Sequence, residues 1–427
     1  MIKIEQRPVC SGVNFRSVRD SRFKTMRMSV NFMVPLKKET AAQNAIIPFL
    51  LSRSNRKYPD FTKLNERLAE LYGAGLDADV QKLGDIQVLS VFAGGIADRY
   101  ALNGESVAAE LTSLLCSAVF EPAFRDGLFP KDDFEQEKRQ MAETLDAEFN
   151  DKRLYALRRC SAIMCEKEPS GVNRFGTKEE IESLKREDLT DAWKKLIRGA
   201  RVEILAVGDC DPEPIYRSFC NAFHSVERTE TVPCENCVVK QPGATKEMTE
   251  RADVAQSKLV MGFRTGCAET DKNVPAMKLM SALYGGSPSS KLFLNVREKM
   301  SLCYYCSSGY NPLKGTMFVQ SGVEQKNIEK AKKEILNQLA EVQNGDFTDA
   351  EFEEAKLSLC NSYHTLSDLL DGLEGWCISK TFSNPVITPE EESDKVSATT
   401  RQELIDAAQN VALDTVYCLT GKEENAE

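Results

Sequence analysis

The chain repeats itself, and this internal repeat constrains its fold more than any other feature. Four segments of the 427 residues recur in the same order in the second half of the chain. The first two recur at one constant spacing, and the last two at a slightly shorter spacing, as loop deletions in the second copy would produce. The paired positions are Phe32 with Phe263, Gly84 with Gly315, Phe134 with Phe352, and Leu189 with Leu404. The sequence therefore predicts two homologous halves.

Each copy has the same predicted order: a strand, two helices, further strands, two long helices, and then a helix and a final strand. In the first strand, apolar side chains alternate from Met26 to Phe32, as expected of a half-buried strand. Thr177 and Thr388 each precede an acidic turn, as helix N-caps do. Strands mixed with helix pairs favour the α+β class: two homologous α/β-sandwich halves, each an antiparallel-rich sheet covered by helices.

The predicted boundaries follow from the repeat. Residues 1–224 form the N-terminal half, and residues 257–427 form the C-terminal half. Residues 225–256 are rich in Thr, Glu and Pro and lack periodicity, which is typical of a surface linker. Two similar domains joined in this way can close as a clamshell over a cleft.

Composition excludes several classes of protein. With 42% apolar and 28% charged residues the chain is typical of soluble globular proteins. It has no apolar run near the roughly 20 residues of a membrane span, and its N-terminus lacks the basic and apolar regions of a secretory signal. A net charge of −10 argues against nucleic-acid binding. Fourteen cysteines without a secretory signal indicate reduced thiols and a cytoplasmic location.

Two C-x-x-C pairs occur, Cys234/Cys237 and Cys303/Cys306. They are too far apart in sequence to be the two halves of a zinc ribbon. The first pair lies in the polar linker and does not open a helix after a strand, which disfavours a thioredoxin-like motif. We interpret both pairs as incidental and leave their role open. His224 and His364, the two histidines, lack a surrounding nucleophile pattern and are interpreted as structural or surface residues.

The segment from Ser289 to Tyr310, SSKLFLNVREKMSLCYYCSSGY, predicts an amphipathic helix followed by a strand with Tyr304 and Cys306 on one face. It resembles the insulinase/pitrilysin family of zinc peptidases (peptidase family M16), in which the pattern is S-R-L-F-x-x-L-R-E-K-x-G-L-A-Y. On this match Arg297 and Tyr304 fall on the family's substrate-contacting Arg and Tyr. A one-residue shift would assign the role to Tyr305, on the opposite face.

The resemblance covers nearly the whole chain, but the zinc motif is lost. Active members carry a helix with the pattern G-x-x-H-F-L-E-H, and here Asn44, Ile47 and Pro48 replace the first His, the general-base Glu and the second His. Zinc in such sites needs two imidazoles on one helix face and a downstream carboxylate. Glu137 matches that carboxylate, but we interpret its charge-dense helix as a solvated face. Because Pro48 lacks a backbone donor, we expect the first helix to start later or to be distorted.

The resemblance implies a non-catalytic member of the family, from its bacterial branch. In the family, the Arg and Tyr hydrogen-bond the peptide carbonyl and stabilise the oxyanion. The implied function is a peptide-binding subunit of a heterodimeric zinc peptidase, inactive alone and without a cofactor of its own. It would supply Arg297 and Tyr304 to a homologous partner that bears the H-x-x-E-H motif and the zinc, as in heterodimers such as the mitochondrial processing peptidase. The alternatives are a structural scaffold subunit and, less favoured, a stand-alone metalloenzyme with cysteine or carboxylate ligands.

Overall fold

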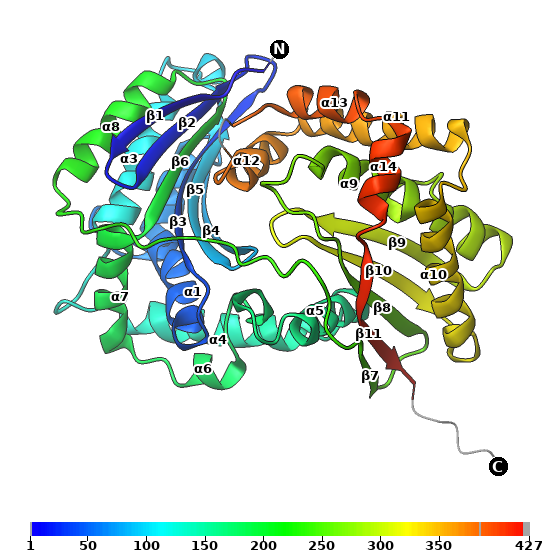
Figure 1. Ribbon diagram of the computed structural model, residues 1–427. Coiled ribbons are helices and arrows are strands. Elements are labelled where there is room, and N and C mark those ends of the chain that lie inside the picture. The colour runs from blue at the N-terminus through cyan, green and yellow to red at the C-terminus, as the bar shows by residue number, and fades with distance from the viewer. Residues whose placement is uncertain (1, 384–385, 422–427) are drawn as a thin grey trace. The chain divides into compact units, whose positions relative to one another are not determined.

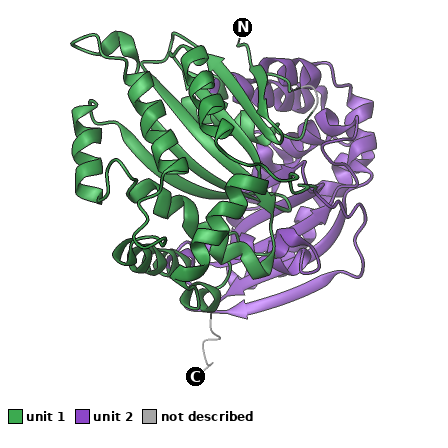
Figure 2. Cartoon of the chain, turned by 90° about the vertical axis from the view of Figure 1, so that its left-hand side faces the viewer, with its two compact units in different colours: residues 1–146, 172–235, 366–388 green, residues 147–171, 236–365, 389–427 purple. Residues whose placement is uncertain are grey.

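The structure is a computed structural model that describes residues 2–383 and 386–421 (Figure 1). The chain divides into two compact units, and each contains one β-sheet (Figure 2). Unit 1 comprises residues 1–146, 172–235 and 366–388, and unit 2 comprises residues 147–171, 236–365 and 389–427. Over the described ranges, no helix is both long and apolar enough to cross a membrane.

The sheet of unit 1 has six strands in the order β1-β2-β6-β3-β5-β4. Its strands are β1 (Glu5–Cys10), β2 (Val13–Arg19), β3 (Thr25–Pro35), β4 (Gly75–Leu83), β5 (Ile86–Ile96) and β6 (Arg201–Gly208). β2 and β6 are parallel, and the other neighbours are antiparallel. Met26, Met28, Val30 and Phe32 are all buried in the main core of this unit, as the predicted alternation requires. The expectation of a half-buried strand is wrong, because Ser29, Asn31 and Met33 on the other face are also buried.

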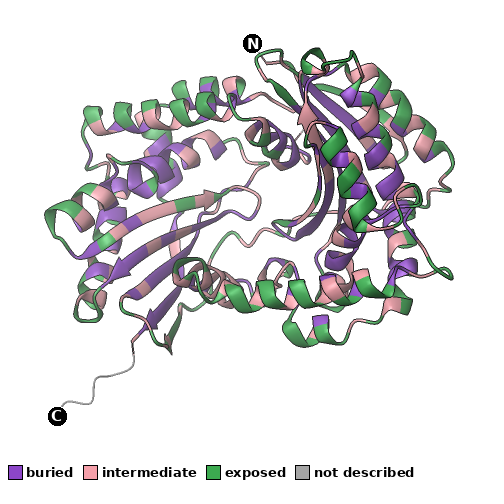
Figure 3. Ribbon diagram, turned by 180° about the vertical axis from the view of Figure 1, so that it is seen from behind, coloured by how far each residue is buried: buried purple, intermediate pink, exposed green. Residues whose placement is uncertain are grey.

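Helices cover both faces of this sheet. One face packs against α1 (Lys38–Arg53), α3 (Val107–Phe120), α7 (Arg186–Gly199) and α8 (Pro212–His224). The other face packs against α12 (Leu370–Ser379), a helix from near the end of the chain. The remaining helices of this part of the chain are α2 (Phe61–Glu70), η1 (Asp98–Tyr100), α4 (Lys131–Glu148) and α6 (Lys178–Glu182). In Figure 3 the strands are mostly buried, and exposed positions concentrate on the helices.

The sheet of unit 2 has five strands in the order β7-β11-β8-β10-β9. Its strands are β7 (Lys246–Arg251), β8 (Ser257–Arg264), β9 (Cys303–Asn311), β10 (Thr316–Val323) and β11 (Ala412–Thr420). β7 lies inside the segment 225–256 and pairs in parallel with β11. The other neighbours are antiparallel.

One face of the second sheet packs against α5 (Lys152–Met164). Its other face, at β9, packs against α9 (Val274–Ser281) and two π-helices, η3 (Ala282–Gly286) and η4 (Leu292–Lys299). The remaining helices are η2 (Pro169–Gly171), η5 (Gln325–Asn327), α10 (Ile328–Asn344), α11 (Asp349–Leu366), α13 (Pro389–Ser397) and α14 (Arg401–Ala408).

The repeat and the α+β class are confirmed by the topology. Without β1, the strands of the first sheet match those of the second in order and direction, with β6, β3 and β5 equivalent to β11, β8 and β10. Gly84 and Gly315 precede equivalent strands with left-handed φ values of 63° and 59°, a conformation that suits glycine. Thr177 forms a capping box at α6, and Thr388 directly precedes α13.

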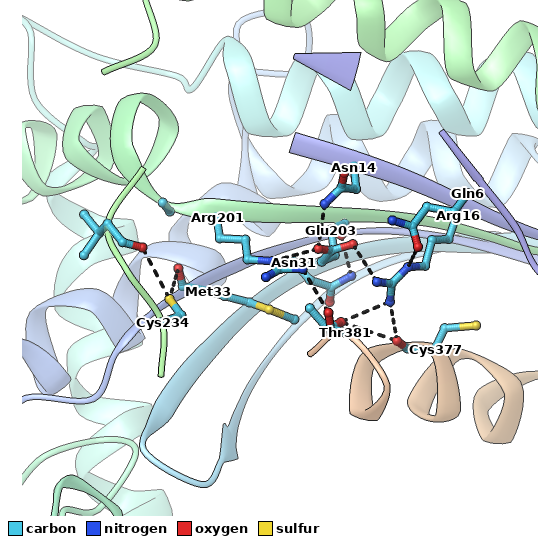
Figure 4. A network of polar contacts seen from close by, with 12 residues as sticks. Gln6, Asn14, Arg16, Asn31, Met33, Arg201, Glu203, Cys234, Cys377 and Thr381 are labelled. Carbon is cyan, nitrogen blue, oxygen red and sulfur yellow. Dashed lines mark hydrogen bonds and ion pairs between the residues drawn. The ribbon is translucent and has the colours of Figure 1, made fainter. Parts of the chain in front are cut away.

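The helices α5 and α12 do not stay with the sheet of their own sequence half. α12 packs on β6, where Leu373, Cys377 and Ile378 are buried in an apolar cluster on the sheet. Figure 4 shows the polar contacts beside this cluster. Arg16 donates to the carbonyl of Cys377 at 2.7 Å and pairs with Glu203 at 3.5 Å, and both charged side chains are at most 1% exposed. The buried arginine therefore links the end of α12 to the sheet.

Candidate functional site

Tyr304 lies in a β-bulge on the edge strand β9. In the pairing of β9 with β10, Cys303 is opposite Val323 and Tyr305 is opposite Gly322, so that Tyr304 has no partner between them. A bulge bends its strand and redirects the extra residue. The side chain of Tyr304 is 66% exposed as a result. The unpaired tyrosine therefore projects into solvent from the edge of the sheet.

Because of the bulge, the expectation that Tyr304 and Cys306 lie on one face of the strand is wrong. Tyr304 and Cys306 do not share an environment, because Cys306 is only 3% exposed. Tyr305 lies on the face of α5, where its ring contacts the guanidinium of Arg153 at 4.5 Å and the ammonium of Lys258 at 5.7 Å. A regular alternation along the strand would have placed Tyr304 and Cys306 together.

Arg297 lies in the last turn of the π-helix η4. Its guanidinium stacks on Phe293 at 4.5 Å and pairs with the neighbouring Glu298 at 3.4 Å, and its side chain is 39% exposed. π-helical turns are rare and frequently occur at functional sites. The Arg297 charge also acts on the thiol of Cys303 at the start of β9, so that the guanidinium lies near the residue that precedes Tyr304.

The three positions predicted to replace the zinc motif, Asn44, Ile47 and Pro48, lie in α1. This helix begins at Lys38 and continues through Pro48 to Arg53, so the expected later start is wrong. Ile47 and Pro48 are buried, and Ile47 belongs to the main core of unit 1. The amide of Asn44 donates to the side-chain oxygen of Gln87 at 3.3 Å. Packing of the apolar helix against the sheet outweighs the hydrogen bond that Pro48 cannot donate.

Glu137 is not on a solvated face, as the charge-dense sequence suggested. It is 5% exposed, and its carboxylate accepts a hydrogen bond from Arg53 at 2.7 Å. Arg53 also contacts Asp133 at 3.3 Å. Burial raises the pKa of Glu137, although the Arg53 guanidinium opposes that shift. Sequence reasoning does not predict Arg53 as the partner of Glu137. The only hint in the sequence is a single arginine near the apolar end of its helix, which the fold places against the acidic helix α4.

These residues do not fit a zinc ion. Asn44 is engaged with Gln87, Ile47 and Pro48 have no ligand atom, and Glu137 is neutralised by Arg53. Over residues 2–383 and 386–421, no group of three or more His, Cys, Asp or Glu side chains is arranged to hold a metal.

Comparisons with known proteins agree with this geometry. Residues 183–359 match the family described as "Peptidase M16 inactive domain". The chain is 30% identical over 412 residues to the "Probable inactive metalloprotease YmfF" of Bacillus subtilis, covering 96% of both chains. A conserved protein from Enterococcus faecalis has a similar structure, with a TM-score of 0.89 and 28% identity over 99% of both chains. A peptidase M16 inactive domain from Pseudomonas fluorescens shares the fold, with a TM-score of 0.77 and 16% identity over 99% of both chains.

The match to YmfF extends over both sequence halves, and the matched family segment includes η4 and β9, which carry Arg297 and Tyr304. The chain therefore belongs to the peptidase M16 family, as an inactive homologue of its metalloproteases.

Proposed function

We propose that this chain is the peptide-binding, non-catalytic subunit of a heterodimeric zinc peptidase. Its role is to supply Arg297 and Tyr304 to a reaction centre whose zinc is held by a homologous partner with an intact H-x-x-E-H motif. The observation that carries the proposal is the bulge at Tyr304, which exposes this tyrosine to solvent, while the charge of Arg297 on the π-helix η4 acts on the neighbouring Cys303.

The chemistry of the two side chains supports this role. A guanidinium keeps its charge in proteins, and a phenol can donate a hydrogen bond without being ionised. Donors fixed before the reaction stabilise the oxygen that becomes negative as a peptide bond is attacked. Arg297 is held by its contacts with Phe293 and Glu298, and the fold restrains the backbone of Tyr304 through the paired residues on both sides of the bulge.

Strand β9 also suits an extended peptide. It is the last strand of its sheet, so one side of its backbone has no strand partner within that sheet. Extended peptides bind such edges through main-chain hydrogen bonds. A peptide in this position would run past Tyr304.

We further propose a cytoplasmic location, which is supported by fourteen cysteines that are all free thiols. We propose residues 1–224 and 257–427 as the two homologous halves, joined by the segment 225–256. The net charge of −10 supports a peptide and a protein subunit as partners in place of a nucleic acid.

Reconstitution tests the proposal. The purified chain is mixed with an H-x-x-E-H homologue from the same organism, and cleavage of fluorogenic peptides is measured. We expect each protein alone to be inactive and the mixture to be active. Arg297→Ala and Tyr304→Phe should each lower kcat/KM by about 10²-fold, the scale of losing one oxyanion donor.

The matched control is Tyr305→Phe, which removes the same hydroxyl from the next residue, whose ring contacts Arg153 of α5. Complex formation by size-exclusion chromatography is measured for every variant. If complexes form and both Arg297→Ala and Tyr304→Phe retain full activity, the chain is a scaffold subunit. If the chain alone hydrolyses peptides in a zinc-dependent manner, the non-catalytic assignment is wrong.

A further inference from the structure

The bulge at Tyr304 has a second consequence, because it brings two cysteines to one face of β9. Residues three apart in a regular strand point to opposite faces. Here Cys303 is opposite Val323 and Cys306 is opposite Ser321 on β10. Val323 and Ser321 are two residues apart and share a face, and directly opposed residues share a face across a ladder. Both cysteines therefore lie on the same face, and their exposed fractions are only 8% and 3%.

The bulge also shortens the distance between the two cysteines along the strand. Cys303 and Cys306 are three residues apart on β9, but their partners Val323 and Ser321 are only two residues apart on β10. At the usual rise of a strand, two residues span about 6.6 Å, which estimates the separation of the two cysteine Cα atoms. Disulfides form where the Cα atoms are within about 7 Å. The estimated separation of the two Cα atoms therefore lies within the range that a disulfide spans.

The two thiols are chemically unequal. The hydrogen bond from Cys306 lowers the pKa of Cys303 to about 7, with further contributions from the Ser321 hydroxyl and the Arg297 charge. The same thiol–thiol hydrogen bond raises the pKa of Cys306. A thiolate beside a protonated thiol is the arrangement of an attacking and a resolving cysteine. By contrast, burial raises the pKa of Cys116 and Cys210 to about 12.

We propose that Cys303 and Cys306 form a redox-active dithiol that peroxide oxidises to a disulfide. The Cys303 thiolate attacks one oxygen of hydrogen peroxide and becomes a sulfenic acid, while the other oxygen leaves as hydroxide. The Cys306 thiol then attacks the oxidised sulfur, and its proton leaves with the sulfenic oxygen as water. Peroxide receives two electrons from the two sulfurs, and a thiol reductant reverses the reaction. The new bond closes across the bulge that carries Tyr304.

A single tryptic peptide reports the reaction. Residues 300–314 contain both cysteines and no internal Lys or Arg, so the disulfide appears as the loss of two hydrogens and a failure to react with an alkylating reagent. The intact reduced chain is treated with hydrogen peroxide, alkylated and digested. We expect this peptide to oxidise at least about tenfold faster than Cys267, as the thiolate fractions of the two residues require, and to be restored by dithiothreitol. Cys267 is a matched control because it is equally buried, with 6% exposure and a raised pKa, and lies on a separate peptide, residues 265–272.

Two variants separate the roles of the cysteines. Cys306→Ser should stop the reaction at a sulfenic acid on Cys303, which is trapped by a cyclic 1,3-diketone. Cys303→Ser should leave Cys306 as slow to react as Cys267. If the wild-type peptide stays reduced while Cys267 is oxidised, or the two react at equal rates, the proposal is wrong. The wild-type measurement decides the question even where a variant fails to fold, and it is independent of the role proposed for Arg297 and Tyr304.

Discussion

Glu137 keeps a carboxylate inside unit 1 because Arg53 supplies the compensating charge. The exposed fractions of the two side chains are 12% for Arg53 and 7% for Glu137. Removing one partner of a buried ion pair leaves the other uncompensated, at a cost of about 3–5 kcal/mol. We therefore expect Arg53→Ala to lower the free energy of unfolding by about 3 kcal/mol in urea titrations.

Arg67→Ala is the control for this prediction, because Arg67 pairs with Glu70 and Glu110, whose side chains are 66% and 40% exposed. Exposed pairs contribute about 0–1 kcal/mol. Adding Glu137→Gln to Arg53→Ala should recover part of the lost stability, since a neutral amide is cheaper to bury than a charge. If Arg53→Ala and Arg67→Ala lower the free energy of unfolding equally, the buried pair contributes no more to stability than an exposed one.

Glu168 should make unit 2 sensitive to acid. Burial alone would raise its pKa, but hydrogen bonds from Arg264 and Lys314 outweigh burial and hold the pKa below 4.5. The carboxylate oxygens lie 2.6 Å and 2.8 Å from the two cations. An unfolded chain binds the proton more readily, so this contribution is complete above pH 4.5 and is lost as the pH falls through the folded pKa.

Urea unfolding at several pH values checks this prediction. We expect Glu168→Gln to lower stability at pH 7 by about 3 kcal/mol, because Arg264 and Lys314 keep their charges without the carboxylate. Below pH 4.5 the difference from the wild type should shrink. The control is Glu66→Gln, at an exposed position of α2, which should leave the free energy of unfolding unchanged both at pH 7 and below pH 4.5. A constant difference at all pH values would exclude titration of Glu168 as the cause.

At the scale of elements, the sequence predicts those features of strands, turns and helix ends that depend on neighbouring residues. The alternation that ends at Phe32 and the cap at Thr177 are confirmed, and Gly84 and Gly315, which the repeat pairs, both lie in the turn before equivalent strands. Each depends on residues close in sequence, because periodicity, turn geometry and capping are local. The recurrence of these patterns also predicts the repeated topology.

The candidate site is less predictable because tertiary contacts decide it. The family pattern predicts a role for Arg297 and Tyr304, but it does not reveal the bulge, which exists only in the register between β9 and β10. The burial of Glu137 depends on Arg53 in a different helix. Pattern reasoning also overstates the local effect of Pro48, since the packing of α1 carries the helix through it. A pairing register and a partner in another helix are not encoded in local periodicity.

Pro48 gives an element-scale prediction. A proline inside a helix costs about 3 kcal/mol relative to alanine. The ring is buried, and losing its two extra carbons costs about 1.6 kcal/mol. The helix term is larger, so Pro48→Ala should stabilise the protein by about 1 kcal/mol in urea unfolding. The variant should still bind no zinc by calorimetry, because Asn44 and Ile47 remain. If Pro48→Ala destabilises the protein instead, the packing of the proline ring contributes more to stability than the alanine gains in helix formation.

At the scale of the whole molecule, the chain exchanges helices between its halves. Residues 147–171, from the first half, belong to unit 2, and residues 366–388, from the second half, belong to unit 1. Each sheet is therefore covered on one face by a helix from the other sequence half. The helix α5, which follows α4 in the first half, packs on the sheet of unit 2, and α12, which follows α11 in the second half, packs on the sheet of unit 1. The segment 225–256 is consequently not the sole connection between the two packing units, and neither half of the sequence contains a complete core.

Fragments of the chain test this exchange. Residues 1–235 lack α12, so the sheet loses the cover of Leu373, Cys377 and Ile378, and Arg16 loses its acceptor on Cys377. Burying each apolar side chain contributes about 1.5–3 kcal/mol. We expect the fragment to bind a hydrophobic dye and to unfold at lower urea than the same fragment fused to residues 366–388 through a Gly/Ser linker. A fusion with Leu373→Asp and Ile378→Asp is the matched control and should behave as the bare fragment. If residues 1–235 alone are as stable as the unmodified fusion, α12 is dispensable and the sequence halves fold independently.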